Sequence, residues 1–260
     1  MADDPPPLVP DDPEETNPMR AAQRLARPEL PKRFYTAATV APADGGFAVL
    51  LDGRTVRTPA KERLVVASRA VAEAIAAEWE AQRDRIDPGT MPVTRIVNAA
   101  IDRVAKEMPA VRDSIVAHAG SDLVCYRADG PEGLVRAQAE AWDPLVAFAR
   151  DDLGARLILA EGIVHARQSE AALAAIARAV APYDPVALAA IHTITTLAGS
   201  AIIALAVARG RLTTEAAWAA AHVDEDWQAA FWGRDEGAVP ARARRFDEMA
   251  AAGLILADRA

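Results

Sequence analysis

The chain has 260 residues, of which 52% are hydrophobic, and it carries a formal net charge of −8. This length and hydrophobic content are enough for a sizeable core, arranged as one large domain or two smaller ones. The negative charge argues against nucleic-acid binding, which depends on lysine and arginine neutralising phosphates, and against electrostatic docking on an anionic membrane.

Residues 1–31 are predicted to form a disordered, acidic and proline-rich tail. The first 15 residues hold six acidic side chains and no basic one. A transit peptide would be rich in arginine and poor in acids, and a secretory signal would contain an apolar run. The sequence therefore predicts a bacterial-type protein that stays in the cytoplasm.

Residues 32–90 are predicted to form a β-rich N-terminal domain that ends in a helix. The apolar run 47–51 and the alternating run 54–58 are joined by Asp52-Gly53, the strongest hairpin signal in the chain. A third short strand is expected at 64–66. Ser68 is a plausible N-cap, and apolar residues then recur at helical spacing as far as about residue 85.

Residues 91–260 are predicted to form a larger, all-helical C-terminal domain. Strands followed by helices, without βαβ alternation, indicate the α+β class. Asp143-Pro144 is expected to kink or restart the helix that contains it. Apolar periodicity and capping residues predict helices over 91–106, 111–124, 134–152, 170–181 and 184–197, another from Thr213 through the 220s, and a last one from Pro240 through Met249.

Residues 186–208 are almost free of charge, and a stretch of this length could span a bilayer. His192, several threonines and Gly199 interrupt it. We therefore expect a buried helix or helix pair and no membrane insertion.

Motifs for catalysis and cofactor binding are not found in the sequence. There is no phosphate-binding loop with the required glycine and lysine spacing, and no Gly-x-Gly-x-x-Gly. His222 with Asp224, Glu225 and Asp226 could gather a metal, but a solvated helix face is the simpler interpretation. The single cysteine, Cys125, is expected to be a small buried hydrophobe. We predict no enzyme, no cofactor and no metal; the alternative is an enzyme whose pocket the sequence does not advertise.

Short motifs recur in order along residues 32–236 and together resemble the Atp12 family of assembly chaperones. They are Arg33-Phe34-Tyr35, Leu51-Asp52-Gly53-Arg54, Ile75-Ala76-x-Glu78-Trp79-x-x-Gln82, Met91-Pro92-Val93-Thr94, Asp122-Leu123-Val124-Cys125-Tyr126-Arg127, Gln138-x-x-x-Trp142-Asp143-Pro144, Gly199-Ser200 and Asp224-Glu225-x-x-Gln228-x-x-x-Trp232-Gly233-x-Asp235-Glu236. The resemblance implies a two-part fold and binding to the free alpha subunit of the F1 ATPase, without catalysis. A monomer is expected, because one cover per alpha subunit is enough.

The last of these motifs supplies the predicted partner-binding residues, Glu225, Gln228, Trp232, Asp235 and Glu236. The first three fall on one side of a helix, and an acidic patch beside tryptophan is typical of an interface anchor. The alternative is that Trp232 and its neighbour Trp227 both belong to the core. The resemblance also implies dependence on one acidic residue here, for which Glu225 and Glu236 are both candidates.

Overall fold

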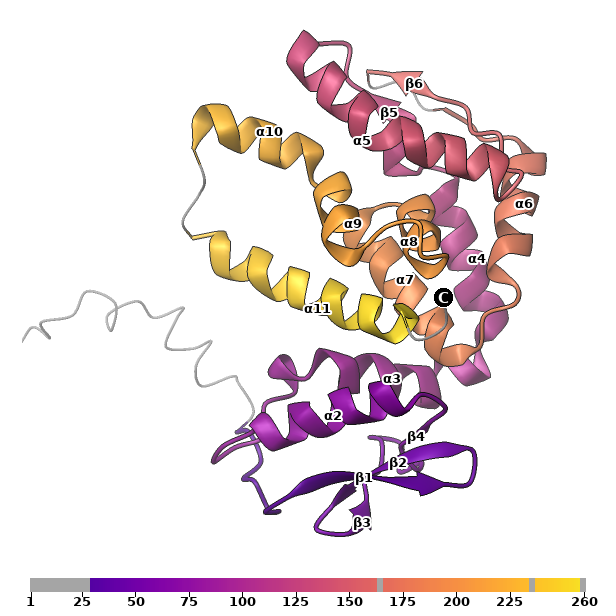
Figure 1. Ribbon diagram of the computed structural model, residues 1–260. Helices are drawn as coiled ribbons and strands as arrows, with labels where there is room; N and C mark the ends of the chain where they lie inside the picture. The colour runs from indigo at the N-terminus through magenta and orange to yellow at the C-terminus, as the bar shows by residue number, and fades with distance from the viewer. Residues whose placement is uncertain (1–28, 163–165, 234–236, 258–260) are drawn as a thin grey trace, which may run out of the picture.

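The computed structural model describes residues 29–162, 166–233 and 237–257, and its N-terminal part is a small antiparallel sheet (Figure 1). The strands are β1 (Ala38–Ala43), β2 (Gly46–Leu51), β3 (Arg54–Thr55) and β4 (Val65–Val66), and β2 pairs with each of the other three. The predicted hairpin is confirmed: Asp52 and Gly53 join β2 to β3 with φ of 46° and 78°, the positive values that a tight two-residue hairpin turn requires.

Helix α2 (Arg69–Ala81) covers this sheet by packing on β1 and β2. It begins where the sequence predicted, because the Ser68 hydroxyl accepts a hydrogen bond from the backbone N–H of Val71 at 3.1 Å. Its apolar side, including Val71 and Ile75, is buried. The short 3-10 helix η1 (Pro88–Thr90) then leads into the larger, helical part.

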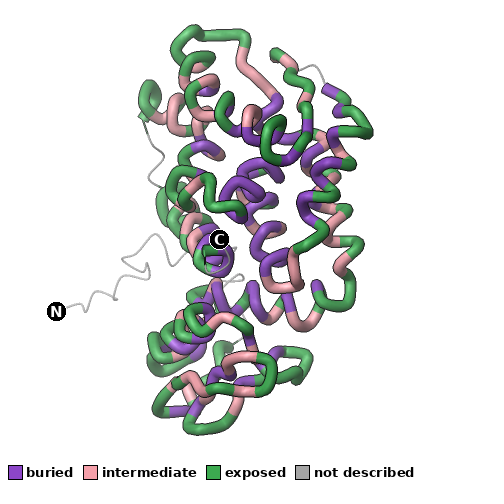
Figure 2. Tube along the Cα trace, turned by 45° about the vertical axis from the view of Figure 1, so that its right-hand side comes forward, coloured by how far each residue is buried: buried purple, intermediate pink, exposed green. Residues whose placement is uncertain are grey.

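The rest of the described chain is mostly helical, which confirms the α+β class. Figure 2 shows that the buried residues concentrate in the helices at the centre of this part. The elements are α3 (Pro92–Asp102), η2 (Val104–Lys106), α4 (Met108–Ala119), η3 (Leu123–Cys125), β5 (Tyr126–Arg127), α5 (Glu132–Asp151), β6 (Ala160–Glu161), α6 (Glu170–Val180), α7 (Pro185–Ala198), α8 (Ala201–Ala208), α9 (Thr214–Ala221), α10 (Val223–Trp232) and α11 (Val239–Ala257).

The uncharged stretch 186–208 forms the helix pair α7 and α8, as predicted. Gly199 separates the two helices in the left-handed conformation, with φ of 65°, and every residue of α8 is buried. Among the described residues, none of the helices combines the length and apolar character that a membrane span needs. This pair is the centre of the hydrophobic core.

Several helix boundaries differ from the sequence prediction: α2 ends at Ala81 and not near residue 85, and α4 spans Met108–Ala119 and not 111–124. The helix that begins after Thr213 does not continue through the 220s, because the backbone leaves helical geometry at His222 and restarts as α10. Pro144 does not restart its helix: it lies on the exposed side of the continuous α5, where water can bond the carbonyl that proline leaves unpaired. The last helix runs eight residues beyond Met249, to Ala257.

Candidate partner-binding site

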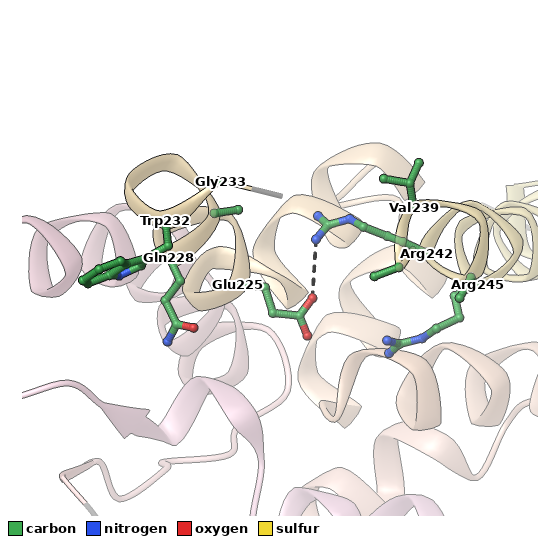
Figure 3. Close-up of a pocket in the computed structure, with 10 residues that line it drawn as sticks. Glu225, Gln228, Trp232, Gly233, Val239, Arg242 and Arg245 are labelled. Atoms are coloured by element: carbon green, nitrogen blue, oxygen red, sulfur yellow. Dashed lines mark hydrogen bonds and ion pairs between the residues drawn. The ribbon is translucent and has the colours of Figure 1, made fainter. Parts of the chain in front are cut away.

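The C-terminal helices α10 and α11 enclose an open cleft that contains three of the five predicted partner-binding residues. The cleft has a volume of about 620 Å³. Glu225, Gln228 and Trp232 line it from α10, and Arg242 and Arg245 line it from α11 (Figure 3). Asp235 and Glu236 lie outside the described residues.

The aromatic residues at the end of α10 are exposed. Trp232 has 86% of its surface accessible and Phe231 68%, so Trp232 is not a core residue. A pair of large apolar side chains left open at a helix end is unusual on a monomeric protein and is characteristic of a binding surface.

Arg242 sets the charge balance of the cleft. Its guanidinium bonds both carboxylate oxygens of Asp226, at 2.7 and 2.8 Å, and reaches Glu225 at 3.4 Å. Asp226 is therefore neutralised within the protein. Glu225 keeps 61% of its side chain exposed and remains available to a cation on a partner.

The base of α10 is held by the buried part of α5. The Trp142 indole donates to the backbone oxygen of Ala220 at 2.7 Å, and the Gln138 amide donates to Asp224 at 2.7 Å. His222 is buried, and its ring lies 3.8 Å from that of Trp218. These contacts fix the direction in which α10 leaves the core, while its far end, with Trp232, stays exposed.

The same contacts weaken the metal hypothesis. Asp224 is bonded to Gln138 and Asp226 to Arg242, so two of the carboxylates that could have joined His222 already have partners. In the described part of the chain, no three histidine, cysteine, aspartate or glutamate side chains gather as a metal site would require.

The sequence prediction missed the α11 side of the cleft. Val239, Arg242 and Arg245 recur at three-residue spacing, which puts them on one face of a helix. That spacing was visible in the sequence. What it could not show is that this face turns toward α10, because that depends on tertiary contacts such as the Arg242–Asp226 ion pair.

The nearest arrangement to a catalytic pair lies elsewhere, in a cavity of about 330 Å³ between α3, α4 and α7. The Ser114 hydroxyl lies 3.3 Å from Nε2 of His192. Burial, and secondarily the nearby His118, lower the pKa of His192. Within the described ranges no carboxylate is hydrogen-bonded to His192, so the orienting group of a nucleophile–base–acid triad is not supplied.

Burial also raises the pKa of the Cys125 thiol to about 12, which suppresses its nucleophilic thiolate.

Comparison with known proteins finds Atp12 proteins both by sequence and by structure. The sequence model described as ATP12 chaperone protein matches residues 32–150. Mitochondrial protein atp12 of Schizosaccharomyces pombe is 23% identical over 231 residues, which is 84% of this chain and 79% of the relative. The crystal structure of Atp12 from Paracoccus denitrificans is 42% identical, with a TM-score of 0.81, over 88% of this chain and 99% of that one. A proposed chaperone from Agrobacterium tumefaciens is 50% identical, with a TM-score of 0.84, over 94% and 91% of the two chains.

The sequence and the α+β fold, shared with these proteins along most of the chain, place the protein among the assembly chaperones. The chain belongs to the Atp12 family. The resemblance inferred from the ordered sequence motifs is confirmed.

Proposed function

We propose that this chaperone binds the free alpha subunit of the F1 ATPase and covers its contact surface until the beta subunit arrives. Membership in the Atp12 family carries the proposal. A subunit that awaits a permanent partner exposes a large apolar interface, which associates wrongly if it is left bare. Covering that surface needs shape, apolar area and charge, and it needs no reactive group.

The α10–α11 cleft is the proposed contact surface. Trp232 offers an exposed aromatic anchor, Gln228 an amide and Glu225 an exposed carboxylate beside the arginines of α11. Asp235 and Glu236 lie outside the described residues, and we propose them as partner-binding residues from the sequence alone. Aromatic residues beside charged ones are the composition in which binding hot spots are found. We further propose that the protein acts in the cytoplasm, as a monomer, without nucleic acid or cofactor.

Co-expression tests the function. The alpha subunit produced alone should accumulate mainly as aggregate, and producing this chain with it should raise the soluble amount and give a complex that co-purifies. Alpha that stays soluble without the chain, or fails to co-purify with it, would refute the proposed function.

Substitutions at the cleft test its placement. Trp232→Ala should weaken capture about 30-fold or more, the loss expected when a hot spot worth ~2 kcal/mol is removed. Glu225→Lys and Glu236→Lys should weaken it as well, and the more damaging of the two identifies the important acid. Ile158→Ala, an exposed apolar residue before β6, and Asp113→Lys, an exposed acid of α4, are the matched controls. If the cleft variants capture alpha as well as the controls do, the surface lies elsewhere although the function stands.

A further inference from the structure

A second hollow lies at the junction of the sheet-covering helix α2 with α3. It has a volume of about 570 Å³. We call it the α2–α3 groove. Its floor includes Trp79, Ile86 and Met91, Pro59 stands on one wall, and Arg57 and Arg103 are on its rim.

Two buried polar atoms in the groove lining have no hydrogen-bond partner. They are Nε1 of Trp79, a donor, and Oδ1 of Asn98, an acceptor. The described residues contain two further unpaired buried atoms, in Arg112 and Arg127, but those guanidinium groups bond through their other nitrogens. Leaving a buried polar group unpaired is costly, so a donor and an acceptor left unpaired in one groove require an explanation.

Several other polar side chains in or near the groove have hydrogen-bond partners within the protein. Gln82 bonds Thr90 and the backbone N–H of Asp87, at 3.1 and 2.8 Å. Asp102, the acid of the lining, accepts from the Thr58 hydroxyl at 2.6 Å and from the Ala60 N–H at 3.0 Å. Gln82 and Asp102 thus have hydrogen-bond partners within the protein, whereas the buried atoms of Trp79 and Asn98 have none.

A peptide group supplies what these two atoms lack, because its carbonyl accepts from an indole N–H and its N–H donates to an amide oxygen. Neighbouring atoms cover both polar atoms, so these covering atoms have to move before an occupant can bond to Trp79 and Asn98. For Asn98, rotation about the Cβ–Cγ bond exchanges the oxygen and the nitrogen. The apolar floor suits one hydrophobic side chain of an extended segment.

The positive charge of the rim indicates that the bound segment carries a negative charge. Arg57 and Arg103 are both exposed. Asp102 keeps its negative charge while it accepts from Thr58 and Ala60, but it is one acid in a lining that holds three arginines. The Arg57 guanidinium donates one hydrogen bond, to the backbone oxygen of Lys61 at 2.8 Å. The guanidinium of Arg103 makes no hydrogen bond or ion pair within the described part of the chain. A carboxylate is the group that a free guanidinium binds best, in a paired geometry.

Helix α11 links the groove to the α10–α11 cleft, because it contacts a residue that lines the groove. Arg95, which lines the groove, pairs with Glu248 of α11 at 3.4 Å. Glu248 follows Arg245 of the cleft by three residues, so it is its neighbour on the same face of α11. Figure 1 shows α3 running beside α11. One partner can therefore reach both hollows.

We propose that the α2–α3 groove binds an extended segment of the captured subunit, with its backbone paired to Trp79 and Asn98 and an aspartate or glutamate held by Arg57 and Arg103. This inference rests on the proposed function, and it gives the chaperone a second point of contact with its partner.

Photo-crosslinking tests the inference on the full chain in complex with alpha. The photoreactive residue benzoylphenylalanine replaces Pro59 in the groove, Gln228 in the cleft or, as a control, Arg178 on the exposed side of α6. Adducts with alpha are expected from positions 59 and 228 and not from 178, and the adduct from 59 should map to a segment with an acidic residue. Arg57→Glu together with Arg103→Glu should reduce that adduct about tenfold, and Arg178→Glu should leave it unchanged.

Asn98→Leu separates binding from folding. Asn98 is half-buried and its buried oxygen has no partner, so an apolar side chain of the same size should leave the melting temperature equal or higher, and should still reduce the adduct from position 59. A melting temperature that falls, with the adduct retained, would mean that Asn98 is structural and would overturn the inference.

The remaining outcomes are distinct. An adduct from position 228 without one from 59 overturns the inference and leaves the proposed function standing. An adduct from 59 to residues 1–28 of the chain itself overturns it too, because the acidic tail is then the occupant. An adduct from 59 that the arginine reversals do not affect refutes the role given to charge. Failure to capture alpha at all refutes the proposed function and the inference together.

Discussion

Asp122 is a buried carboxyl group that joins two distant parts of the chain. It accepts hydrogen bonds from the backbone N–H of Ile202 at 3.1 Å and of Val124 at 3.3 Å, and another from the Ser200 side chain. It therefore closes the turn at η3 and caps the start of α8 at once. Burial raises the pKa of this carboxyl to about 6, and the hydrogen bonds lower it only in part.

A pH dependence of stability follows from this raised pKa. The folded protein holds the Asp122 proton more tightly than the unfolded chain does. Protonated Asp122 therefore adds to the unfolding free energy in full below about pH 4, and this addition is lost as pH rises through about 6. Asp122→Asn should remove this component: the difference in unfolding free energy between wild type and variant should change by about 3 kcal/mol over that window. Urea unfolding at several pH values measures it. A difference that is constant with pH would contradict the raised pKa.

The residues of the family motifs illustrate what the sequence could not reveal. Asp122 and Ser200 come from two separate motifs and bond to each other. Glu78 and Thr94 also come from separate motifs, and the Thr94 hydroxyl donates to the Glu78 carboxylate at 2.6 Å. Their identities and order were enough to indicate the family. That they meet in pairs depends on tertiary contacts, and no periodicity within a single helix encodes those.

At the scale of elements, capping residues predicted three helix starts, and local signals failed at the ends that tertiary packing decides. Ser68, Asp184 and Thr213 each cap the helix that the sequence assigned to them. The break at His222 was not predicted, because the buried ring stacks on Trp218 and no proline or glycine marks the position. The exposed end of α10 follows from that break, so the position of Trp232 could be predicted on the helix but its exposure could not.

Helix α11 continues past its predicted end because Gly253 lets it approach α9 closely. A Cβ placed on Gly253 would lie 2.0 Å from the Thr214 hydroxyl and 3.1 Å from the Thr214 Cβ. Gly253→Ala should therefore lower the unfolding free energy by about 1–2 kcal/mol, since overpacking outweighs the gain of alanine in helix propensity. Gly133→Ala, in the first turn of α5, is the matched control, because its Cβ would meet Trp227 at an ordinary 3.5 Å. Thermal unfolding compares them; equal melting temperatures would show that α9 shifts without cost.

At the scale of the whole molecule, the predicted division of the chain between residues 90 and 91 stays a prediction. Hydrogen bonds cross it at several places. Glu78 of α2 accepts from the backbone N–H groups of Val93 and Thr94, at 2.7 and 2.8 Å, and so caps α3 from the other side of the division. Asp102 at the far end of α3 holds Thr58, which lies beyond β3. Helix α3 in turn packs on α7 and α11, so it is shared between the sheet and the helical core.

We therefore expect the sheet and the helical core to unfold as one cooperative unit. Hydrogen exchange in increasing urea should show the amides of β2 and those of α7 opening with the same urea dependence. Glu78→Gln should make β2 open at lower urea than α7, because an amide cannot accept all three bonds that the carboxylate receives from Val93 and Thr94. Glu73→Gln, an exposed position on the same helix, should leave the two segments coupled. Separate opening in the wild type would instead mean that residues 32–90 fold on their own, with Glu78 contributing only a local cap to α3.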